Sequence, residues 1–396
     1  MPETDRVTEA ARPGAHGLKE VALLFLRLGF TAFGGPAAHI AMMEDEVVRR
    51  RRWLSREDFL DLLGATHLIP GPNSTELAIH LGHRRGGWAG LLVAGACFIL
   101  PATLIVSAVA WAYVRFGSLP AAEALLYGIK PVIIAVVLQA LWGLGRSAVK
   151  TRLLAAVGVA AVGASAVGLD ELLVLAGAGV VMVLWRWGER AAGRGGEPGG
   201  RGGRMAVGLP LALHGLVAGA TSVAPFSLGK LFLFFVKVGS VLFGSGYVLL
   251  AFLEGEFVDR FGWLTQAQLV DAIAVGQVTP GPVFTTATFV GYVVAGLPGA
   301  FLATVAIFLP SFVFVGLLTR ITHRLRSSRW MAAGLDGVNA AALALMAGVT
   351  ARLAGTAVVD PLPAAITVVT LALLWRTRLN STWYVAGGAA VGLLQA

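Results

Sequence analysis

Residues 29–72 read GFTAFGGPAAHIAMMEDEVVRRRRWLSREDFLDLLGATHLIPGP, and residues 239–282 read GSVLFGSGYVLLAFLEGEFVDRFGWLTQAQLVDAIAVGQVTPGP. The two stretches align without a gap at a constant offset of 210, and fourteen of the 44 aligned positions are identical. The likeness continues with Gly86 opposite Gly296 and, after one deletion, Pro101 opposite Pro310. A block that recurs at a fixed spacing indicates an internal duplication, so the chain is expected to fold as two related halves.

The composition is that of an integral membrane protein. Of the 396 residues, 57% are hydrophobic and 13% are charged, whereas an ordinary soluble domain has about 25% charged residues. The net charge of +9 resides mostly in basic residues that flank apolar segments, which makes it a topology signal and no indication of nucleic acid. We therefore expect an all-α polytopic membrane protein in contact with the lipid bilayer, and soluble enzymes are nearly excluded.

Thirteen apolar stretches are expected to form helical elements, many of them near the ~20 residues that span a bilayer. They cover residues 21–43, 60–82, 87–114, 122–145, 153–168, 170–187, 207–226, 230–253, 267–291, 296–319, 331–352, 358–376 and 381–395. The expected domains are an N-terminal cytoplasmic segment 1–20 without a cleaved signal peptide, a first repeat 21–187, a Gly/Arg-rich linker 188–206, and 207–396 as an extra helix plus the second repeat.

Basic loops indicate the relative orientation of the two halves, because Lys and Arg mark the cytoplasmic side. The Arg49–Arg52 run corresponds to Asp259–Gly262, which keeps only Arg260, whereas the basic cluster 320–329 has a nearly neutral counterpart around 115–123. Equivalent loops therefore lie on opposite sides. The sequence predicts inverted repeats, with the N-terminus and the linker cytoplasmic and the C-terminus external.

Two motifs interrupt the apolar runs at membrane depth. Gly34-Gly35-Pro36 breaks the first run and Pro70-Gly71-Pro72 breaks the second, with Gly244-Ser245-Gly246 and Pro280-Gly281-Pro282 at the equivalent places. Proline removes a backbone donor, so the unpaired groups must be buried in protein or line a cavity. A simple kink explains one such motif, but repetition in both halves favours a transporter binding site formed by broken helices.

Few ionisable residues lie inside the apolar runs. Arg27 and Lys237 occupy equivalent positions two helical turns before the breaks at Gly34 and Gly244, so each can attract an anion to its break or merely extend to the membrane interface. Three repeated carboxylate pairs either carry a coupled proton or form structural ion pairs with Arg50 and Arg260: Glu44/Glu254, Glu46/Glu256 and Asp61/Asp271.

Hydroxyl and amide side chains follow the second break in each half. Asn73, Ser74 and Thr75, with Thr285 and Thr286, are expected at new helix N-termini, where they either coordinate an oxyanion or act as plain N-caps. Glu76 aligns with Thr286 in the second half, so the repeat does not support a functional role for this carboxylate.

Other chemistry lacks a pattern. The sequence has no nucleotide-binding, hydrolase or zinc-protease motif and one cysteine, Cys97, so no cofactor, metal site or catalytic residue is expected. The spacing of Gly82, Gly86 and Gly90 allows close helix contact within one chain or in a homodimer.

Together, the strings FLRLGFTAFGGPAAHIAMMEDEVV, WLS and LIPGPNSTELAIHLG, and their counterparts FVKVGSVLFGSGYVLLAFLEGEFV, WLT and TPGP, resemble the chromate ion transporter family in its long two-domain form. The resemblance implies an inner-membrane carrier that exports chromate, with sulfate as a chemically similar dianion. Gly244-Ser245-Gly246 departs from the GGP pattern, which puts an equal role for the two breaks in doubt.

The residues and the resemblance meet in one expected mechanism: a central site that binds a tetrahedral dianion, exported by the membrane potential with proton antiport as an optional addition. A passive anion channel and a membrane-embedded enzyme are the alternatives. The expected substrate-binding residues are Arg27, Gly34, Gly35, Pro36, Pro70, Gly71, Pro72, Asn73, Ser74, Thr75, Lys237, Gly244, Ser245, Gly246, Pro280, Gly281, Pro282 and Thr285.

Overall fold

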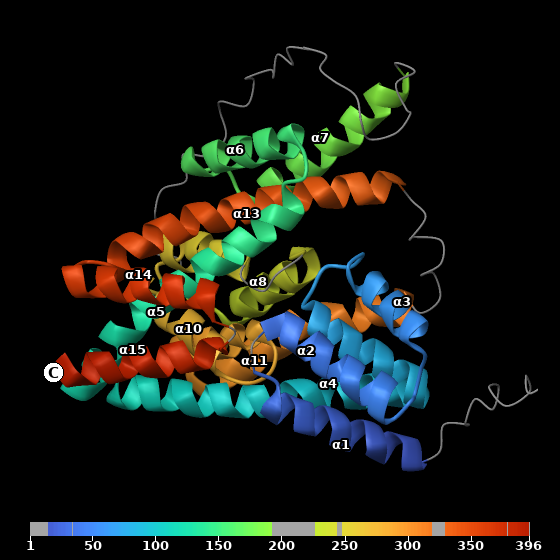
Figure 1. The fold of residues 1–396 in the computed structure, drawn as a ribbon, viewed down its shortest axis with the longest axis horizontal. Coiled ribbons are helices and arrows are strands. Elements are labelled where there is room, and N and C mark those ends of the chain that lie inside the picture. The colour runs from blue at the N-terminus through green and yellow to red at the C-terminus, as the bar shows by residue number, and fades with distance from the viewer. Residues whose placement is uncertain are drawn as a thin grey trace, which may run out of the picture.

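The computed structural model describes residues 15–33, 35–191, 226–243, 248–318, 329–377 and 379–395. Within these ranges every regular element is a helix (Figure 1). The expected extra helix at 207–226, most of the linker and most of the basic cluster 320–329 lie outside the described residues, as do Gly34, Gly244, Ser245 and Gly246.

The first repeat contains eight elements. They are α1 (Ala15–Thr31), α2 (Gly35–Glu44), the π-helix η1 (Asp45–Arg50), α3 (Arg56–Thr66), α4 (Asn73–Phe116), α5 (Pro120–Ala148), α6 (Arg152–Ala166) and α7 (Glu171–Ala191). The apolar run 21–43 is thus divided between α1 and α2, and the run 60–82 between α3 and α4. The breaks fall at the motifs that the sequence singled out.

The second repeat follows the same order. It comprises α8 (Leu228–Val241), α9 (Leu249–Leu253), η3 (Glu254–Arg260), α10 (Gln266–Val278), the 3-10 turn η4 (Val283–Thr285), α11 (Thr286–Leu318), α13 (Arg329–Ala357), α14 (Pro361–Arg376) and α15 (Ser381–Gln395). Five described helices, α4, α5, α7, α11 and α13, are long and apolar enough to cross a membrane.

The two repeats are inverted relative to each other. Their equivalent long helices α4 and α11 pack antiparallel: the Trp88 ring lies against Gly316, Gly95 lies against Phe312, and Tyr113 packs on Phe289 with ring centroids 5.1 Å apart. In Figure 1 the described chain begins with α1 at one end of the molecule and finishes with α15 at the opposite end. The duplication and the inverted topology expected from the sequence are both confirmed.

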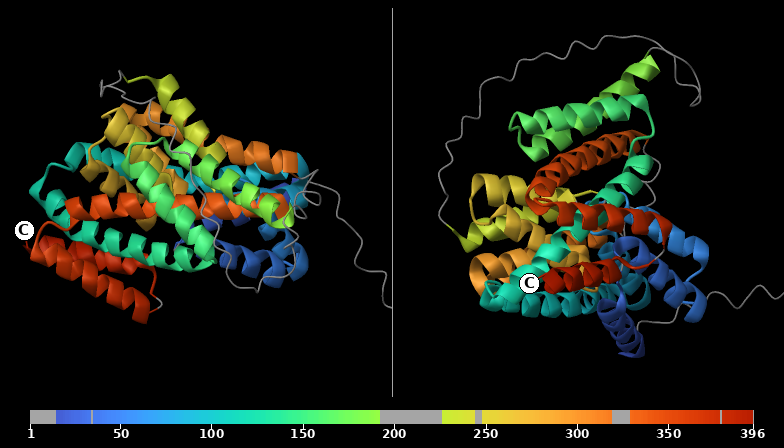
Figure 2. Two further views of the ribbon diagram at one scale, coloured as in Figure 1. Left: turned by 90° about the horizontal axis from the view of Figure 1, so that it is seen from above. Right: turned by 60° about the vertical axis from the view of Figure 1, so that its left-hand side comes forward.

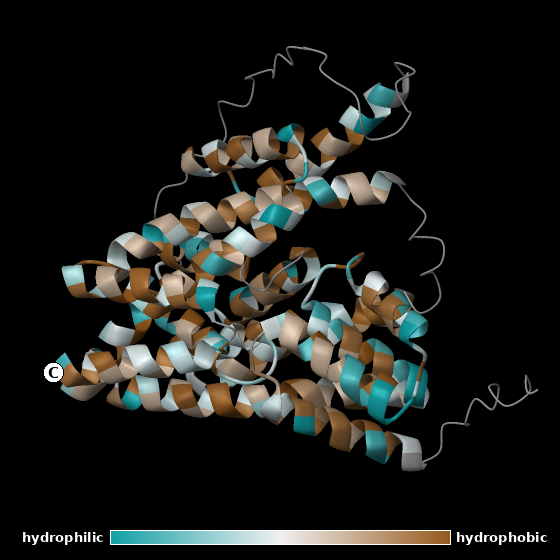
Figure 3. Cartoon of the chain, in the orientation of Figure 1, coloured by the Kyte–Doolittle hydropathy of each residue, from teal (hydrophilic) through white to brown (hydrophobic). Residues whose placement is uncertain are grey.

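Helices of both halves interlock around the centre. Figure 2 shows α13 of the second half running beside α6 and α7 of the first, and Lys150 pairs with Asp336 at 3.7 Å between the halves. Figure 3 shows hydrophobic colour on the outward faces of the helices as well as inside. Large apolar side chains such as Leu104, Phe301 and Val368 are exposed, as expected for surfaces that face lipid.

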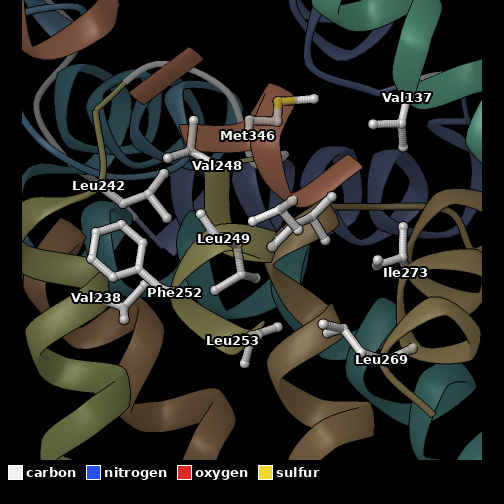
Figure 4. Close-up of a cluster of buried hydrophobic side chains, with 14 of the residues drawn as sticks. Val137, Val238, Leu242, Val248, Leu249, Phe252, Leu253, Leu269, Ile273 and Met346 are labelled. Carbon is white, nitrogen blue, oxygen red and sulfur yellow. The ribbon is translucent and has the colours of Figure 1, made fainter. Parts of the chain in front are cut away.

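The short helix α9 is buried on all sides. Leu249, Phe252 and Leu253 are fully buried, and Figure 4 shows them surrounded by side chains from α5, α8, α10 and α13, including Met346. A helix that is hydrophobic all round belongs in a core. This packing holds the second repeat's broken helix pair in place.

The E-x-E and W-L-[ST] motifs, which both repeats contain, have defined structural roles. Each E-x-E motif lies at the start of a π-helix, closed by bonds in which the amides of Arg51 and Phe261 donate to the carbonyls of Glu46 and Glu256, at 2.9 and 2.8 Å. Ser55 and Thr265 then cap the N-termini of α3 and α10. The motif serines and threonines therefore satisfy free helix donors, the role that N-cap residues have.

A second break divides α4 and α11 within their lengths. Gly87 has φ 60° and ψ −149°, and Gly296 has φ 63° and ψ −154°. The structure thus pairs Gly87 with Gly296, one residue away from the pairing with Gly86 that the sequence predicted. Gly82 and Gly90 then pack backbone to backbone within the chain, as Gly291 and Gly299 do in the second half.

We expect Gly87→Ala or Gly296→Ala to lower the free energy of unfolding by about 1–3 kcal/mol, because this backbone region is accessible essentially to glycine alone. The measurement is the thermal unfolding midpoint of the purified protein in detergent. Gly143→Ala is the matched control, since Gly143 lies inside α5 with open space where its Cβ would be. A Gly87→Ala protein as stable as the control would contradict the assigned backbone geometry.

Candidate functional site

Two reciprocal backbone hydrogen bonds join the repeats at their centre. The Gly71 amide donates to the carbonyl of Leu242 at 2.8 Å, and the Gly281 amide donates to the carbonyl of Ala32 at 2.9 Å. Gly71 and Gly281 are equivalent residues, as are Ala32 and Leu242. Each Pro-Gly-Pro break therefore binds the C-terminal end of the other repeat's first helix. The two contacts are equivalent, and each joins a break of one repeat to a helix end of the other.

Both glycines adopt a backbone conformation that side chains rarely allow. Gly71 has φ 136° and Gly281 has φ 91°. A Cβ at Gly71 would collide with Glu76 and Ser311, and one at Gly281 would lie 2.7 Å from the Cβ of Ala102. The prolines on either side exclude helix, while glycine provides the amide and the close approach. The sequence signal at Pro70–Pro72 and Pro280–Pro282 thus marked the point where the two halves meet.

Several helices begin beside these bonds. α2 starts at Gly35 with Pro36 in its first turn, α4 starts at Asn73, and η4 followed by α11 starts after Pro282. Helix N-termini carry free N–H groups and partial positive charge, which favour anions. The broken helices thus direct several N-terminal ends toward one region of the protein.

Buried hydroxyl groups line the same region. Ser74, Thr75, Thr285, Thr286 and Ser311 are each at most 2% exposed. The Thr285 and Thr286 hydroxyls donate to the carbonyls of Pro282 and Val283 at 2.7 and 2.8 Å. The hydroxyls of Thr75 and Ser311, in contrast, are buried without a hydrogen-bond partner. Such groups are rare in folded proteins, and a bound water, ion or ligand is a common partner for them.

His39 connects the two breaks of the first repeat. Its Nε2 lies 3.0 Å from the carbonyl of Ala32, and its Nδ1 lies 3.3 Å from the hydroxyl of Ser74. A neutral ring that donates to the carbonyl accepts from the hydroxyl. His39 therefore fixes the N-terminus of α4 against the end of α1, a positioning role that the sequence reading missed because the second half has Leu249 at this position.

Arg27 and Lys237 bind carboxylates within their own repeats. Arg27 Nη1 lies 3.3 Å from Glu46 Oε1, and Lys237 Nζ lies 3.2 Å from Glu256 Oε1. Arg50 and Arg51 also contact Glu46, and Arg260 contacts Glu256. The structure thus places these cations in two equivalent ion-pair clusters beside the π-helices.

The other repeated carboxylates are mostly paired as well. Glu44 pairs with Arg56 at 3.3 Å, and the fully buried Glu254 pairs with Arg352 at 2.7 Å. Asp271 accepts a hydrogen bond from Tyr113 at 2.9 Å and lies 3.4 Å from Lys130. Asp61 is exposed on α3. Asn73 bonds to His67 at 3.0 Å.

Glu76 is the residue of the centre that the repeat comparison passed over. It is fully buried in the first turn of α4, and neither carboxylate oxygen has a hydrogen-bond partner. The comparison of the two halves finds only residues that both halves share. Glu76 aligns with a threonine, so the comparison does not find it. The signal that was present is simpler: a carboxylate four residues after Pro72 inside an apolar helix.

A separate cavity of about 350 Å³ lies between the end of α4, the start of α5 and α10. Its lining includes Val109, Tyr113, Phe116 and Leu125 and is almost wholly apolar. An oxyanion needs donors that such a lining lacks. Among the described residues no group of three or more His, Cys, Asp or Glu side chains is arranged to bind a metal.

Comparison with known proteins identifies the family. The family described as chromate transporter matches residues 19–183 and again residues 229–393. The chain is 34% identical to the chromate transport protein of Cupriavidus metallidurans over 99% of this chain and 97% of that protein. It is 30% identical to the chromate transport protein of Pseudomonas aeruginosa, over 99% and 95%.

A probable chromate transport protein of Synechococcus elongatus is 31% identical over 91% of each chain. No solved structure matches this fold significantly. The two matched segments coincide with the two inverted repeats that meet at Gly71 and Gly281. The chain belongs to the chromate transporter family and is a multi-pass membrane protein.

Proposed function

We propose that the protein is a secondary transporter that exports chromate from the cytoplasm and thereby confers chromate resistance, without catalysing a reaction. The observation that carries this proposal is the convergence of helix N-termini and buried, unpartnered hydroxyls on the two reciprocal Pro-Gly-Pro breaks. Chromate transport is the function named for relatives aligned over nearly the whole chain. The proposed domains are those expected from the sequence, with the N-terminus and the linker cytoplasmic.

Amides and hydroxyls suit a tetrahedral dianion, because they supply donors without fixing a particular chemical identity. Sulfate has the same charge and shape, so an oxyanion carrier that prefers sulfate is the second candidate. The two breaks Pro70–Pro72 and Pro280–Pro282 are buried, which corresponds to a state closed toward both sides. Inverted repeats open such a site alternately by movement of one half against the other.

The membrane potential can drive the export of a dianion. Moving one charge through 100 mV is worth about 2.3 kcal/mol, so a dianion that leaves an inside-negative cell gains about twice that. Proton antiport would require a carboxylate that gains and loses a proton. Glu44, Glu46, Glu254, Glu256 and Asp271 are ion-paired, so the geometry offers none of these five as a carrier.

Inverted membrane vesicles test the proposal directly. We expect radiolabelled chromate to accumulate in vesicles that contain the protein when an inside-positive potential is imposed, and unlabelled sulfate to compete only where the site accepts it. Potential and pH gradient are imposed separately, so that the effective gradient identifies the coupling. Movement of sulfate alone would change the substrate, and movement of neither anion would overturn the proposed function.

We expect Thr75→Val to weaken chromate binding roughly ten- to hundredfold, because a hydrogen bond to a charged group contributes about 1.5–3 kcal/mol. The measurement is the chromate concentration that gives half-maximal transport. Thr350→Val is the matched control, because Thr350 is equally buried but its hydroxyl bonds to the Met346 carbonyl of its own helix. Equal effects of the two substitutions would remove Thr75 from the site.

The Arg27→Gln/Lys237→Gln double variant separates two roles for these cations. The sequence assigned them to the dianion, whereas the geometry supports ion pairs that position the π-helices. Because Arg27 is 59% exposed and Glu46 and Glu256 each keep another arginine, we expect a loss of about 1 kcal/mol or less per site in unfolding free energy and transport within a few-fold of wild type. Abolished chromate binding in a folded double variant would show that the two cations bind the substrate.

A further inference from the structure

The first segment of α4 presents three titratable side chains on one face. Glu76, His80 and His83 are spaced at i, i+4 and i+7, which places them in a row along a helix. The row starts at the Pro-Gly-Pro break and ends near the second break at Gly86 and Gly87. None of the three has a role in the oxyanion site proposed above.

The Glu76 carboxylate has no charged partner. It is fully buried, and the polar group beside it is the uncharged Ser311 hydroxyl of α11, next to Gly71. In the part of the chain that the structure describes, no lysine or arginine forms an ion pair with it. A buried carboxylate without a partner is stable only when it is neutral.

The groups around Glu76 do not provide a positive charge. On its own helix the next titratable residue is His80. α2 contributes His39, whose two ring nitrogens already form hydrogen bonds with the Ala32 carbonyl and the Ser74 hydroxyl. His67, the residue after α3, forms a hydrogen bond with Asn73. α11 contributes Ser311. A dianion at the N-terminus of α4 would therefore lie close to Glu76 with no cation between them.

Two negative groups so placed repel each other strongly in a buried site. The dianion and an ionised Glu76 consequently exclude one another, whereas a protonated Glu76 removes the repulsion and can donate a hydrogen bond to the oxyanion. Binding of the dianion is thus linked to binding of one proton.

The two histidines extend from Glu76 toward one face of the protein. His80 is 3% exposed, and its Nε2 has no hydrogen-bond partner. His83 is partly exposed and packs against Trp88, with ring centroids 5.4 Å apart. Arg85, two residues later, pairs with Glu20 in α1 at 2.8 Å, so this end of the row lies beside the first turns of α1. A neutral imidazole can accept a proton at one ring nitrogen and release one from the other, so it can relay protons without staying charged.

We propose that Glu76 is the proton-binding residue of the oxyanion site, that its protonation accompanies binding of the dianion, and that His80 and His83 pass the proton between Glu76 and the face where α1 begins. The inference rests on the proposed oxyanion transport. It adds that a proton controls binding of the oxyanion. The second half has Thr286, Phe289 and Tyr292 at the matching positions, so the route exists on one side only. Proton and dianion then travel together, with one net negative charge moved per cycle.

Equilibrium binding of radiolabelled chromate to the purified full-length protein in lipid nanodiscs tests the linkage. The pH is raised over the alkaline range, in which chromate stays a dianion. For the wild type we expect affinity to fall tenfold per pH unit once Glu76 ionises, because one proton binds with each dianion. Glu76→Gln, which is permanently neutral, should bind chromate at all these pH values as tightly as wild type does at the lowest.

Glu44→Gln is the control, because it removes a carboxylate that pairs with Arg56 outside the centre and should keep the wild-type pH dependence. A pH slope that persists in Glu76→Gln overturns the proposal, as does wild-type binding that is independent of pH throughout the range in which the protein stays folded. Absence of chromate binding to wild type at any pH would instead refute the proposed function. Should Glu76→Gln fail to fold, uptake of one proton per bound dianion by weakly buffered wild-type protein gives the same test.

His80→Leu separates the route from the binding residue. We expect chromate affinity and its pH dependence to remain as in wild type, since Glu76 is intact, while the rate of chromate transport in vesicles falls at least tenfold. His67→Leu provides the control, because His67 is an exposed histidine outside the row that bonds to Asn73. Transport by His80→Leu at the rate of the His67→Leu protein would exclude His80 from the proton route.

Discussion

The hydrogen bonds of Gly71 with Leu242 and of Gly281 with Ala32 constrain the whole architecture. In a bilayer every backbone polar group needs a partner, so a helix that ends at membrane depth is stable only where another segment satisfies its last carbonyls. Here each repeat supplies the donor that the other lacks. Neither half completes its broken helices alone, so the two inverted halves have to associate. The hydroxyl-lined centre exists because these bonds bring the N-terminus of α4 and the turn before α11 to the same place.

The ion-pair clusters at Glu46 and Glu256 support this arrangement from a short distance away. Each lies on a π-helix that follows the second helix of the broken pair, and each binds the basic residue of the first helix, Arg27 or Lys237. These ion pairs tie each π-helix to the first helix of its broken pair. Burying a charge is costly unless it is paired, so the two helices of each broken pair are held in a fixed register.

Much of this architecture could be predicted from the sequence, and the reason is the duplication. Positions that both halves share, such as Pro70–Pro72 and Pro280–Pro282, are the ones that the symmetric contacts require. The same comparison could not find partners, because Arg27 and Glu46 are nineteen residues apart and only the fold brings them together. It also could not find asymmetric features. His39 and Glu76 have Leu249 and Thr286 opposite them, so a search for repeated residues assigns them no weight.

This asymmetry follows from how an inverted pair has to work. The reciprocal bonds require the same residues at the contact points of both halves, because each half supplies the donor for the other. Transport has a direction, and a pathway for protons to one face needs side chains on one half only. Glu76 lies where both demands meet: next to the symmetric Gly71, and at the start of the row of His80 and His83 that the second half lacks. In the proposed mechanism, residues that differ between the repeats at the centre therefore distinguish the two faces of the membrane, while residues that agree hold the frame in which they act.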